Sequence, residues 1–333
     1  MADLSKYRAV ALLAALFVLG ALLRPVAASQ QAAATVTVAD QYGSAAVTLY
    51  FLEETGAYLI PVSRRVVDEA EQTPARALAE LLAGPKAGPL VPFFEGGATL
   101  LDLTIKSGQA KIALSMPEMV EQLSTHAMDG LRWTMTEFEE IEQIAVTVNG
   151  WSVDADGKFV DQITPLARPA AINSQFSGVG HPVMLYFGYG ADPSLLVPVT
   201  TYLATTDSKT TDRETVAGDA QITQIIEQLL VGPPAGSHLL STIPETVHLL
   251  DVHMDGVIAN VNFSEELVIA YRLKEANALH VRKAVIATLT SLPGVYAGSI
   301  KIGGSSLLYF TCQNAVMEHP QAKPWAINDE FYM

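Results

Sequence analysis

The sequence contains a single cysteine, Cys312, and few charged residues. One cysteine excludes an intrachain disulfide framework and a zinc site built from several thiolates. Charged residues make up 17% of the 333 positions and hydrophobic residues 50%, a balance that excludes a disordered chain. Basic residues are scarce, with 20 Lys and Arg against 35 Asp and Glu. The net charge of -15 argues against a nucleic-acid partner, because such binding needs a basic face.

The sequence also lacks an apolar run of the roughly 20 residues that span a bilayer comfortably. A shorter run of fifteen residues extends from Ala9 to Leu23, after Lys6 and Arg8 and before the small-residue stretch 26–29. This pattern is typical of an export signal. Residues 1–28 are therefore predicted to be either a cleaved signal peptide or a retained signal anchor. In both cases the body of the chain is extracytoplasmic, either secreted or anchored to the cell membrane through this segment.

What the sequence does contain is a repeat, in which the stretch Leu81 to Pro85 returns as Leu229 to Pro233. Other short stretches return in the same order, at offsets that drift from 136 to 154, as insertions into loops would produce. They pair Leu49-Tyr50-Phe51 with Leu185-Tyr186-Phe187, Leu59-Ile60-Pro61-Val62 with Leu196-Val197-Pro198-Val199, and Leu100-Leu101-Asp102 with Leu249-Leu250-Asp251. The chain is therefore predicted to be a tandem of two similar domains.

The repeat divides the chain into consecutive segments after the export signal. They are a spacer (29–46), domain 1 (47–151), a linker rich in Pro and Gly (152–182), domain 2 (183–304) and an irregular tail that the repeat does not cover (305–333). The shared positions form a structural signature of the repeat: Pro61, Gly84, Pro85, Pro198, Gly232 and Pro233. We interpret each Gly-Pro pair as a helix stop, since glycine allows a left-handed cap and proline cannot continue the helix.

Each copy is predicted to follow the order β-β-α-β-β-α-β. In the first copy the expected elements are a hairpin of 47–52 and 58–67, a helix from Thr73 to Gly84, a hairpin of 99–105 and 109–114, a second helix opened by the capping-box spacing Ser115 to Glu118, and a closing strand 144–148. Two helices on one face of a largely antiparallel sheet indicate an α+β fold, with each copy a two-layer sandwich.

The sequence motifs of phosphate-binding loops, serine nucleophiles and paired carboxylates identify no catalytic residue. Neither copy has the G-x-x-x-x-G-K spacing of a phosphate-binding loop, and the G-x-G at Gly178 has no helix cap after it. Ser115 and Ser264 recur at one repeat position, but both stand where a helix needs an N-cap and neither lies in a G-x-S-x-G elbow. The glutamate pairs are expected to be solvated charges in turns or at helix ends: Glu53-Glu54, Glu139-Glu140 and Glu265-Glu266.

Two weaker signals for binding remain. Asp251 and His253 lie two apart on a predicted strand and point to one face, as a metal site would need, but a half-exposed edge pair is the preferred interpretation. No metal ligand and no cofactor site is therefore assigned. The second signal is a set of exposed-looking aromatic residues that a partner surface would use: Trp151, Trp325, Tyr50 and Tyr186. For the two tyrosines, which lie on predicted strands, half-buried packing residues are the preferred interpretation.

The repeated stretches, taken in order, resemble the GerMN domain. They are a strand with Tyr-Phe, a strand with Leu-Ile-Pro-Val or Leu-Val-Pro-Val, a helix ending in Leu-Leu-x-Gly-Pro, a Leu-Leu-Asp strand and a helix with Thr-x-Thr. The resemblance covers about residues 47 to 151 and 183 to 304. GerMN domains are found in sporulation and spore germination proteins of endospore-forming bacteria.

The resemblance implies a non-enzymatic envelope protein at the sporulation septum, which helps to build or stabilise the channel complex between mother cell and forespore. It also implies similarity of the α-β-β-α-β portion of each copy to the ring-building motif. The implied partners are envelope or septal membrane proteins and peptidoglycan, with the oligomeric state open. One departure is that such proteins typically carry a lipid-bearing cysteine after the signal, whereas no cysteine precedes Cys312. This departure favours a retained apolar anchor.

A rival interpretation is an envelope peptidoglycan- or carbohydrate-binding module, with a hydrolase as a more distant third. A glycan binder would present co-facial aromatic residues at matching places in both copies. Trp151 has only Ser305 near the equivalent position, which weakens this interpretation without excluding it.

Overall fold

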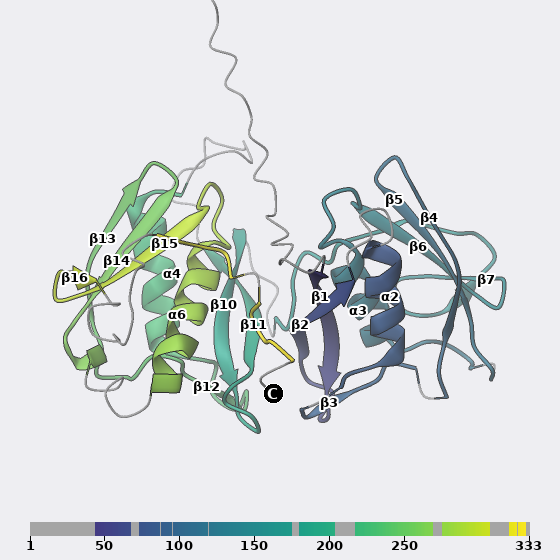
Figure 1. The fold of residues 1–333 in the computed structure, drawn as a ribbon, viewed down its shortest axis with the longest axis horizontal. Coiled ribbons are helices and arrows are strands. Elements are labelled where there is room, and N and C mark those ends of the chain that lie inside the picture. The colour runs from purple at the N-terminus through teal and green to yellow at the C-terminus, as the bar shows by residue number, and fades with distance from the viewer. Residues whose placement is uncertain are drawn as a thin grey trace, which may run out of the picture. The chain divides into compact units, whose positions relative to one another are not determined.

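The computed structural model describes most of the chain from Ser44 onward (Figure 1). The described residues are 44–67, 73–86, 88–94, 96–118, 120–174, 180–203, 217–268, 275–306, 320–324 and 326–330. The predicted export signal, nearly all of the spacer, Gly178 and Trp325 lie outside them. Within these ranges, no helix combines the length and the apolar character that a membrane crossing requires.

The first repeat contains the predicted elements in the predicted order. They are β1 (Ser44–Glu53), β2 (Leu59–Val67), α2 (Thr73–Ala83), β4 (Thr99–Lys106), β5 (Gln109–Ser115), α3 (Thr125–Met135) and β6 (Gln143–Val148), with a short additional strand β3 (Leu90–Val91). The alternation of apolar residues that predicts the hairpins is realised, because β1 pairs antiparallel with β2, and β4 with β5.

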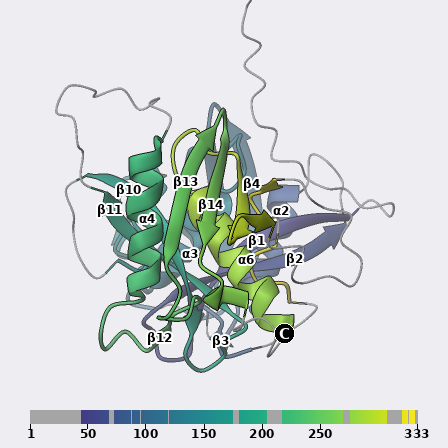
Figure 2. The same ribbon diagram turned by 90° about the vertical axis from the view of Figure 1, so that its left-hand side faces the viewer.

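The second repeat has the same order of elements. They are β10 (His181–Tyr189), β11 (Leu196–Leu203), α4 (Asp219–Val231), β12 (Leu239–Leu240), β13 (Leu249–Asp255), β14 (Ile258–Phe263), α6 (Glu275–Leu289) and β15 (Ala297–Ile302), followed by β16 (Ser305–Ser306) and β17 (Gln321–Ala322). Figure 2 shows this repeat with the antiparallel pair β13 and β14 side by side. The α+β class and the tandem of two similar domains are confirmed.

The strands of each repeat are divided between two sheets, which the sequence pattern alone does not reveal. In the first repeat the strand orders are β2-β1-β3 and β4-β5-β6, and in the second they are β11-β10-β12 and β13-β14-β15. The pairs β5–β6 and β14–β15 are parallel, because a helix connects their strands. Each helix pair packs against both sheets of its repeat (Figure 1), and buried residues of the two repeats form one continuous apolar cluster.

The predicted start of the second helix is wrong. Ser115 is the last residue of β5 and pairs with Thr99, so its S-x-x-E spacing does not form a capping box. The Asn149 side chain holds the following residue in the loop, accepting from Met116 N and donating to Met116 O, both at 3.0 Å. Helix α3 begins ten residues after Ser115, and Ser124 is its N-cap, with a hydroxyl that accepts from Ala127 N at 3.0 Å.

Part of the stretch predicted as a linker, 152–182, continues the sheet of the first repeat. Asn149 and Gly150 both have positive φ, 49° and 87°, which suits a tight hairpin turn. This turn leads into β7 (Trp151–Val153), which pairs with β6 and then with β8 (Phe159–Val160). A short strand β9 (Leu166–Ala167) pairs with the start of β6.

The glycine of each Leu-Leu-x-Gly-Pro stretch ends its helix, as predicted. Gly84 has a φ of 87° and donates its N–H to Leu81 O at 3.1 Å, and Gly232 has a φ of 89° and donates to Leu229 O at 3.2 Å. The expected left-handed cap is wrong at Gly232, whose ψ of -176° lies in a region that only glycine occupies readily. Glycine is thus required at this position for a different backbone shape.

Replacing Gly84 or Gly232 with Val is expected to lower the free energy of unfolding by about 1 kcal/mol or more, because β-branched residues resist positive φ. At Gly84 the new Cβ would also lie 3.2 Å from Pro92 Cβ. Gly218→Ser is the matched control, since Gly218 caps α4 with a φ of -92° and serine is a favoured N-cap. Urea unfolding measures the difference. Stability equal to that of the control in both valine variants would contradict the conformational argument.

Candidate functional site at the seam between the repeats

The two repeats meet along β2 and β11, and we call this contact the seam. Each strand lies at one end of its sheet, in the orders β2-β1-β3 and β11-β10-β12. An edge strand leaves a row of backbone N–H and C=O groups without partners in the sheet. At the seam, asparagine side chains from two other segments bind several of these groups.

Asn173 makes the first of these connections. Its Oδ1 accepts from Leu59 N at 2.8 Å, while its Nδ2 donates to Leu59 O at 2.8 Å and to Pro198 O at 2.7 Å. One amide group therefore binds both backbone groups of a β2 residue and a carbonyl of β11. The strands of the two repeats are joined through a single side chain.

Asn328 makes the reciprocal connection and is buried. Its Oδ1 accepts from Leu196 N at 2.8 Å, while its Nδ2 donates to Leu196 O at 2.8 Å and to Pro61 O at 2.7 Å. Leu59 and Leu196 are equivalent in the repeat, as are Pro61 and Pro198. The two asparagines thus play the same part with the repeats exchanged, the relation found in an isologous interface between two copies of one chain.

The sequence around these asparagines is itself repeated, in addition to the stretches that define the two domains. Arg168-Pro169-Ala170-Ala171-Ile172-Asn173 returns as Lys323-Pro324-Trp325-Ala326-Ile327-Asn328. We call Ala171–Asn173 and Ala326–Asn328 the Ala-Ile-Asn motifs. The expectation that the repeat does not cover the tail is therefore wrong. Each repeat ends in its own Ala-Ile-Asn motif, which a shared spacing of Pro and Asn could have signalled.

Further hydrogen bonds, most of them between backbone groups, extend the seam on both sides. Ile172 N donates to Thr200 Oγ1 and Thr200 N donates to Ile172 O, both at 2.9 Å. In the tail, Ser63 N donates to Asn328 O at 2.6 Å and Glu330 N donates to Ser63 O at 3.3 Å. The tail therefore runs alongside β2 and adds to the edge of the first sheet.

The position of the signature prolines follows from this arrangement. Pro61 and Pro198 pair with Tyr50 and Tyr186 in their hairpins, and each strand is an edge strand. Proline has no N–H to donate, so it is tolerated at an edge, where its carbonyl remains available. At the seam, these carbonyls accept hydrogen bonds from the two asparagines.

Glu53 is fully buried, so the expectation of a solvated charge is wrong at this position. Its carboxylate accepts from Thr55 N at 2.7 Å, from Ala57 N at 2.6 Å and from the Tyr189 hydroxyl of the second repeat at 2.6 Å. Burial alone would raise the pKa of this carboxyl, but the hydrogen bonds from Thr55 and Tyr189 hold it below its usual value. Glu53 is therefore an ionised structural group.

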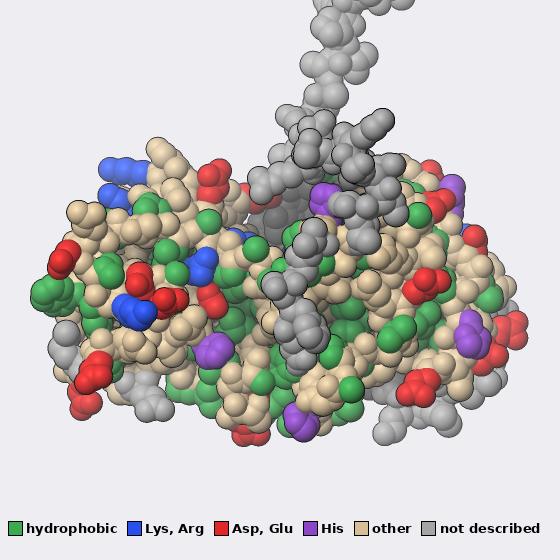
Figure 3. All heavy atoms as spheres, turned by 180° about the vertical axis from the view of Figure 1, so that it is seen from behind, with side chains coloured by type: hydrophobic (Ala, Val, Ile, Leu, Met, Phe, Trp, Pro, Cys, Tyr) green, Lys and Arg blue, Asp and Glu red, His purple; other side chains and the backbone are tan. Residues whose placement is uncertain are grey.

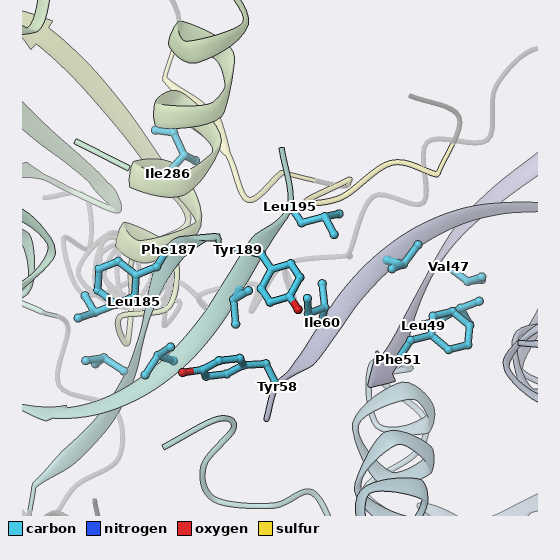
Figure 4. Close-up of a cluster of buried hydrophobic side chains, with 14 of the residues drawn as sticks. Val47, Leu49, Phe51, Tyr58, Ile60, Leu185, Phe187, Tyr189, Leu195 and Ile286 are labelled. Carbon is cyan, nitrogen blue, oxygen red and sulfur yellow. The ribbon is translucent and has the colours of Figure 1, made fainter. Parts of the chain in front are cut away.

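Tyr58 makes a similar contact in the opposite direction. Its hydroxyl donates to Ser237 O of the second repeat at 2.6 Å. Figure 4 shows Tyr58 and Ile60 of the first repeat beside Tyr189 and Leu195 of the second, within the buried apolar cluster. The seam thus combines apolar packing with hydrogen bonds that have a definite direction.

Arg64 is buried under the tail, with an exposed fraction of 2%. Its guanidinium donates to Glu330 Oε2 at 2.5 Å and Oε1 at 2.6 Å, to Glu80 Oε2 at 2.8 Å and to Gly84 O at 3.0 Å. Burial alone would lower the pKa of the Arg64 guanidinium. The carboxylates of Glu330 and Glu80 outweigh this effect and hold the pKa above its usual value. Arg64 thus ties the tail of the chain to the helix stop of the first repeat.

Tyr50 and Tyr186 are buried, so both are packing residues and neither belongs to an exposed aromatic surface. The Tyr50 hydroxyl donates to Glu137 Oε1 at 2.9 Å. Arg168 stacks over the Trp133 ring at 4.0 Å and forms an ion pair with Glu137. Burial raises the pKa of Glu137, but Arg168 outweighs that effect and holds it below its usual value. This cluster packs the first Ala-Ile-Asn motif region against α3.

The remaining residues singled out from the sequence do not converge. Asp251 and His253 are exposed on β13, and His253 Nδ1 lies 3.9 Å from Asp219 Oδ2. Ser264 accepts from His248 N at 3.0 Å, and Trp151 is 52% exposed. The described residues contain no group of three or more potential metal ligands.

Figure 3 shows acidic side chains spread over one face, not gathered into a patch.

Comparison with known proteins identifies the class to which this two-repeat arrangement belongs. The family model Germane, described as sporulation and spore germination, matches residues 48–154 and 184–308. One match falls on each repeat, and together they cover more than half of the chain. The protein belongs to the Germane family.

Two relatives make the similarity more specific. The chain is 26% identical over 150 residues to the spore germination protein GerM of Bacillus subtilis (strain 168), a match that covers 42% of this chain and 41% of GerM. It therefore spans less than half the length of the curated relative that it matches. The solved structure of the tandem GerMN domains of the sporulation protein GerM from Bacillus subtilis has a TM-score of 0.59 at 22% identity and covers 86% of this chain and 99% of that chain. This likeness shows the fold.

Proposed function

We propose that the protein is a non-enzymatic assembly protein of the sporulation septum. It acts outside the cytoplasm, held at the membrane by its N-terminal apolar segment or released from it, and helps to build or stabilise the channel complex between mother cell and forespore. The observation that carries this proposal is the match of each repeat to a family of sporulation and spore germination proteins. The similarity to GerM supports the same process.

The chemistry of the seam favours an assembly role over catalysis. The buried polar groups Glu53, Arg64 and Asn328 all bind partners within the protein, so they hold the repeats together and are not presented to a substrate. An assembly protein acts through its exposed faces. A few residues on such a face, which become buried when the partner binds, supply most of the affinity. The proposed partners are envelope or septal membrane proteins and peptidoglycan.

The alternative of a peptidoglycan- or carbohydrate-binding module has less support. It would use exposed aromatic residues as stacking platforms, and Trp151 is exposed at the start of β7. Its counterpart in the second repeat lies near Ser305, at the start of β16. The exposed aromatic residue is therefore not repeated in the second domain, and the assembly role remains the preferred interpretation.

A complementation assay in a sporulating host that lacks its own copy tests the proposal. Deleting residues 1–28 is expected to abolish septal localisation and function together, because the export signal is lost. Replacing Ser115, Asp251 or His253 with Ala is expected to leave spore yield within about twofold of wild type, since surface changes usually cost less than about 0.5 kcal/mol. Protein levels are checked by blotting. A loss of function in one of these alanine variants, with the protein folded and localised, would contradict the non-enzymatic role.

A further inference from the structure

A cavity of about 340 Å³ lies beside the first Ala-Ile-Asn motif. Its walls come from the turn into β2, from one face of α3 and from the segment that carries Asn173. The lining residues are Ala57, Tyr58, Leu59, His126, Asp129, Trp133 and 171–174. This volume falls at the lower end of the roughly 300–1,000 Å³ that small-molecule sites occupy. The cavity is large enough for one side chain or one small molecule.

The second repeat shows what occupies the equivalent place there. Helices α3 and α6 align without a gap, because both Thr-x-Thr pairs and the starts of β6 and β15 share an offset of 154. By this alignment His126 corresponds to His280, and Asp129 corresponds to Lys283. Lys283 Nζ donates to Ile327 O at 3.5 Å, and Ile327 is the counterpart of Ile172 in the Ala-Ile-Asn motif.

The second repeat therefore fills this position with its own alkylammonium group. In the first repeat a carboxylate replaces the lysine, and the space between α3 and the Ala-Ile-Asn motif is a cavity. Asp129 Oδ1 accepts from Arg132 at 3.0 Å, and within the described part of the chain Oδ2 accepts no hydrogen bond. Burial raises the pKa of Asp129, and Arg132 and His126 oppose that effect only in part. A further cation beside Asp129 would stabilise the ionised form of its carboxyl group.

The other walls of the cavity suit the aliphatic stem of an alkylammonium group. The side chains of Leu59 and Ile172 are buried apolar groups that pack in one cluster, and Ala57 and Tyr58 complete this wall. The Asn173 amide is engaged at the seam, and Arg168 stacks over the Trp133 ring. Asp129 is thus the charged group of the cavity that is best placed to bind a ligand, because His126 is exposed.

We propose that this cavity binds a primary ammonium group on an aliphatic stem, as presented by a lysine side chain of a partner protein, with the Asp129 carboxylate as its counter-ion. The stem packs against Leu59 and Ile172 in the way that apolar walls commonly hold a ligand with one charged end. This site rests on the difference between Asp129 and Lys283 at equivalent positions of the two repeats, and it is independent of the proposed role in sporulation.

Calorimetric titration of the full-length chain tests this inference. The probe is Nα-acetyl-lysine amide, and its matched control is Nα-acetyl-norleucine amide, which has the same stem without the ammonium. We expect the lysine probe to bind at least roughly tenfold more tightly than the control, because only the lysine probe pairs with a half-buried carboxylate. Equal affinity of the two probes would overturn the proposal.

Variants locate the site. Asp129→Asn is expected to weaken binding of the lysine probe by roughly tenfold or more. Asp129→Lys is expected to abolish it, because the new side chain fills the cavity as Lys283 does, and retention of the melting temperature shows that the fold is intact. Asp156→Asn, at an exposed carboxylate paired with Lys158, is the control and should bind as wild type does. Unchanged affinity in both Asp129 variants would overturn the proposal.

A third probe, cadaverine, separates two sources of the same chemistry. A free diamine offers the ammonium and the stem without a peptide backbone. Preference for the lysine probe supports a partner protein, as proposed. Cadaverine binding as tight as or tighter than that of the lysine probe would overturn the partner-protein part and assign the cavity to a free amine.

Discussion

Replacing Arg64 with Ala is expected to lower the free energy of unfolding by about 3–5 kcal/mol, because it leaves the buried carboxylate of Glu330 without its counter-ion. Glu330 has an exposed fraction of 4%, and both of its oxygens bind Arg64. Glu80 and the carbonyl of Gly84 also lose a donor. Since Glu330 lies in the tail, the variant is expected to release the tail from β2.

Two measurements check this expectation. Urea unfolding gives the change in stability, and hydrogen exchange at Ser63 N, which donates to Asn328 O, reports whether the tail still covers β2. Lys158→Ala is the control, because Lys158 and Asp156 form an exposed ion pair that is worth at most about 1 kcal/mol. Wild-type stability in the Arg64 variant would show that the buried pair makes no net contribution.

The alternation of β2 could have identified Arg64 as buried. Ile60, Val62 and Val66 face the core, and Arg64 occupies the same parity. Glu53 likewise continues the alternation of Leu49 and Phe51 on β1 and occupies a core position. Charged residues are rarely buried without partners, so a charge at a core position signals a structural ion pair or network. Local pattern alone, however, could not name the partner, because Glu330 is 266 positions away.

The sequence predicts the elements better than the contacts between them. Hairpins and helix stops depend on neighbouring residues, so the order of elements in both repeats is confirmed. The capping box at Ser115 failed because the spacing of two polar residues says nothing about the ladder pairing of Ser115 with Thr99. The Ala-Ile-Asn motifs were missed because only three adjacent residues are identical, within segments that carry no periodic pattern.

The cavity could not be predicted for a related reason. The alignment of α3 with α6 places Asp129 opposite Lys283 in the sequence, which reveals a reversal of charge between the repeats. That the position is filled in the second repeat follows only from the contact of Lys283 Nζ with Ile327 O, and that it is open in the first follows only from the cavity beside Ile172. Only the three-dimensional contact between the Ala-Ile-Asn motif and the helix makes the reversal informative.

Replacing both Asn173 and Asn328 with Ala is expected to separate the unfolding of the two repeats. Each substitution removes three hydrogen bonds and leaves backbone groups of Leu59 or Leu196 without them. A buried group left without a partner costs about 1–3 kcal/mol, so each variant should lose at least that amount. Because the two asparagines bind equivalent groups on opposite repeats, the double variant removes both asparagine connections while the Tyr189–Glu53 and Tyr58–Ser237 hydrogen bonds remain.

Scanning calorimetry measures the result, since cooperative unfolding of one unit gives one transition and uncoupled units give two. We expect one transition for the wild type and two for the double variant. Each single variant is expected to separate the two transitions less than the double variant does. Asn262→Ala is the matched control, because Asn262 accepts one exposed hydrogen bond, from Gly304 N at 3.0 Å, away from the seam. A single transition at the wild-type temperature in the double variant would show that the apolar packing and the hydrogen bonds of Glu53 and Tyr58 join the repeats without the asparagines.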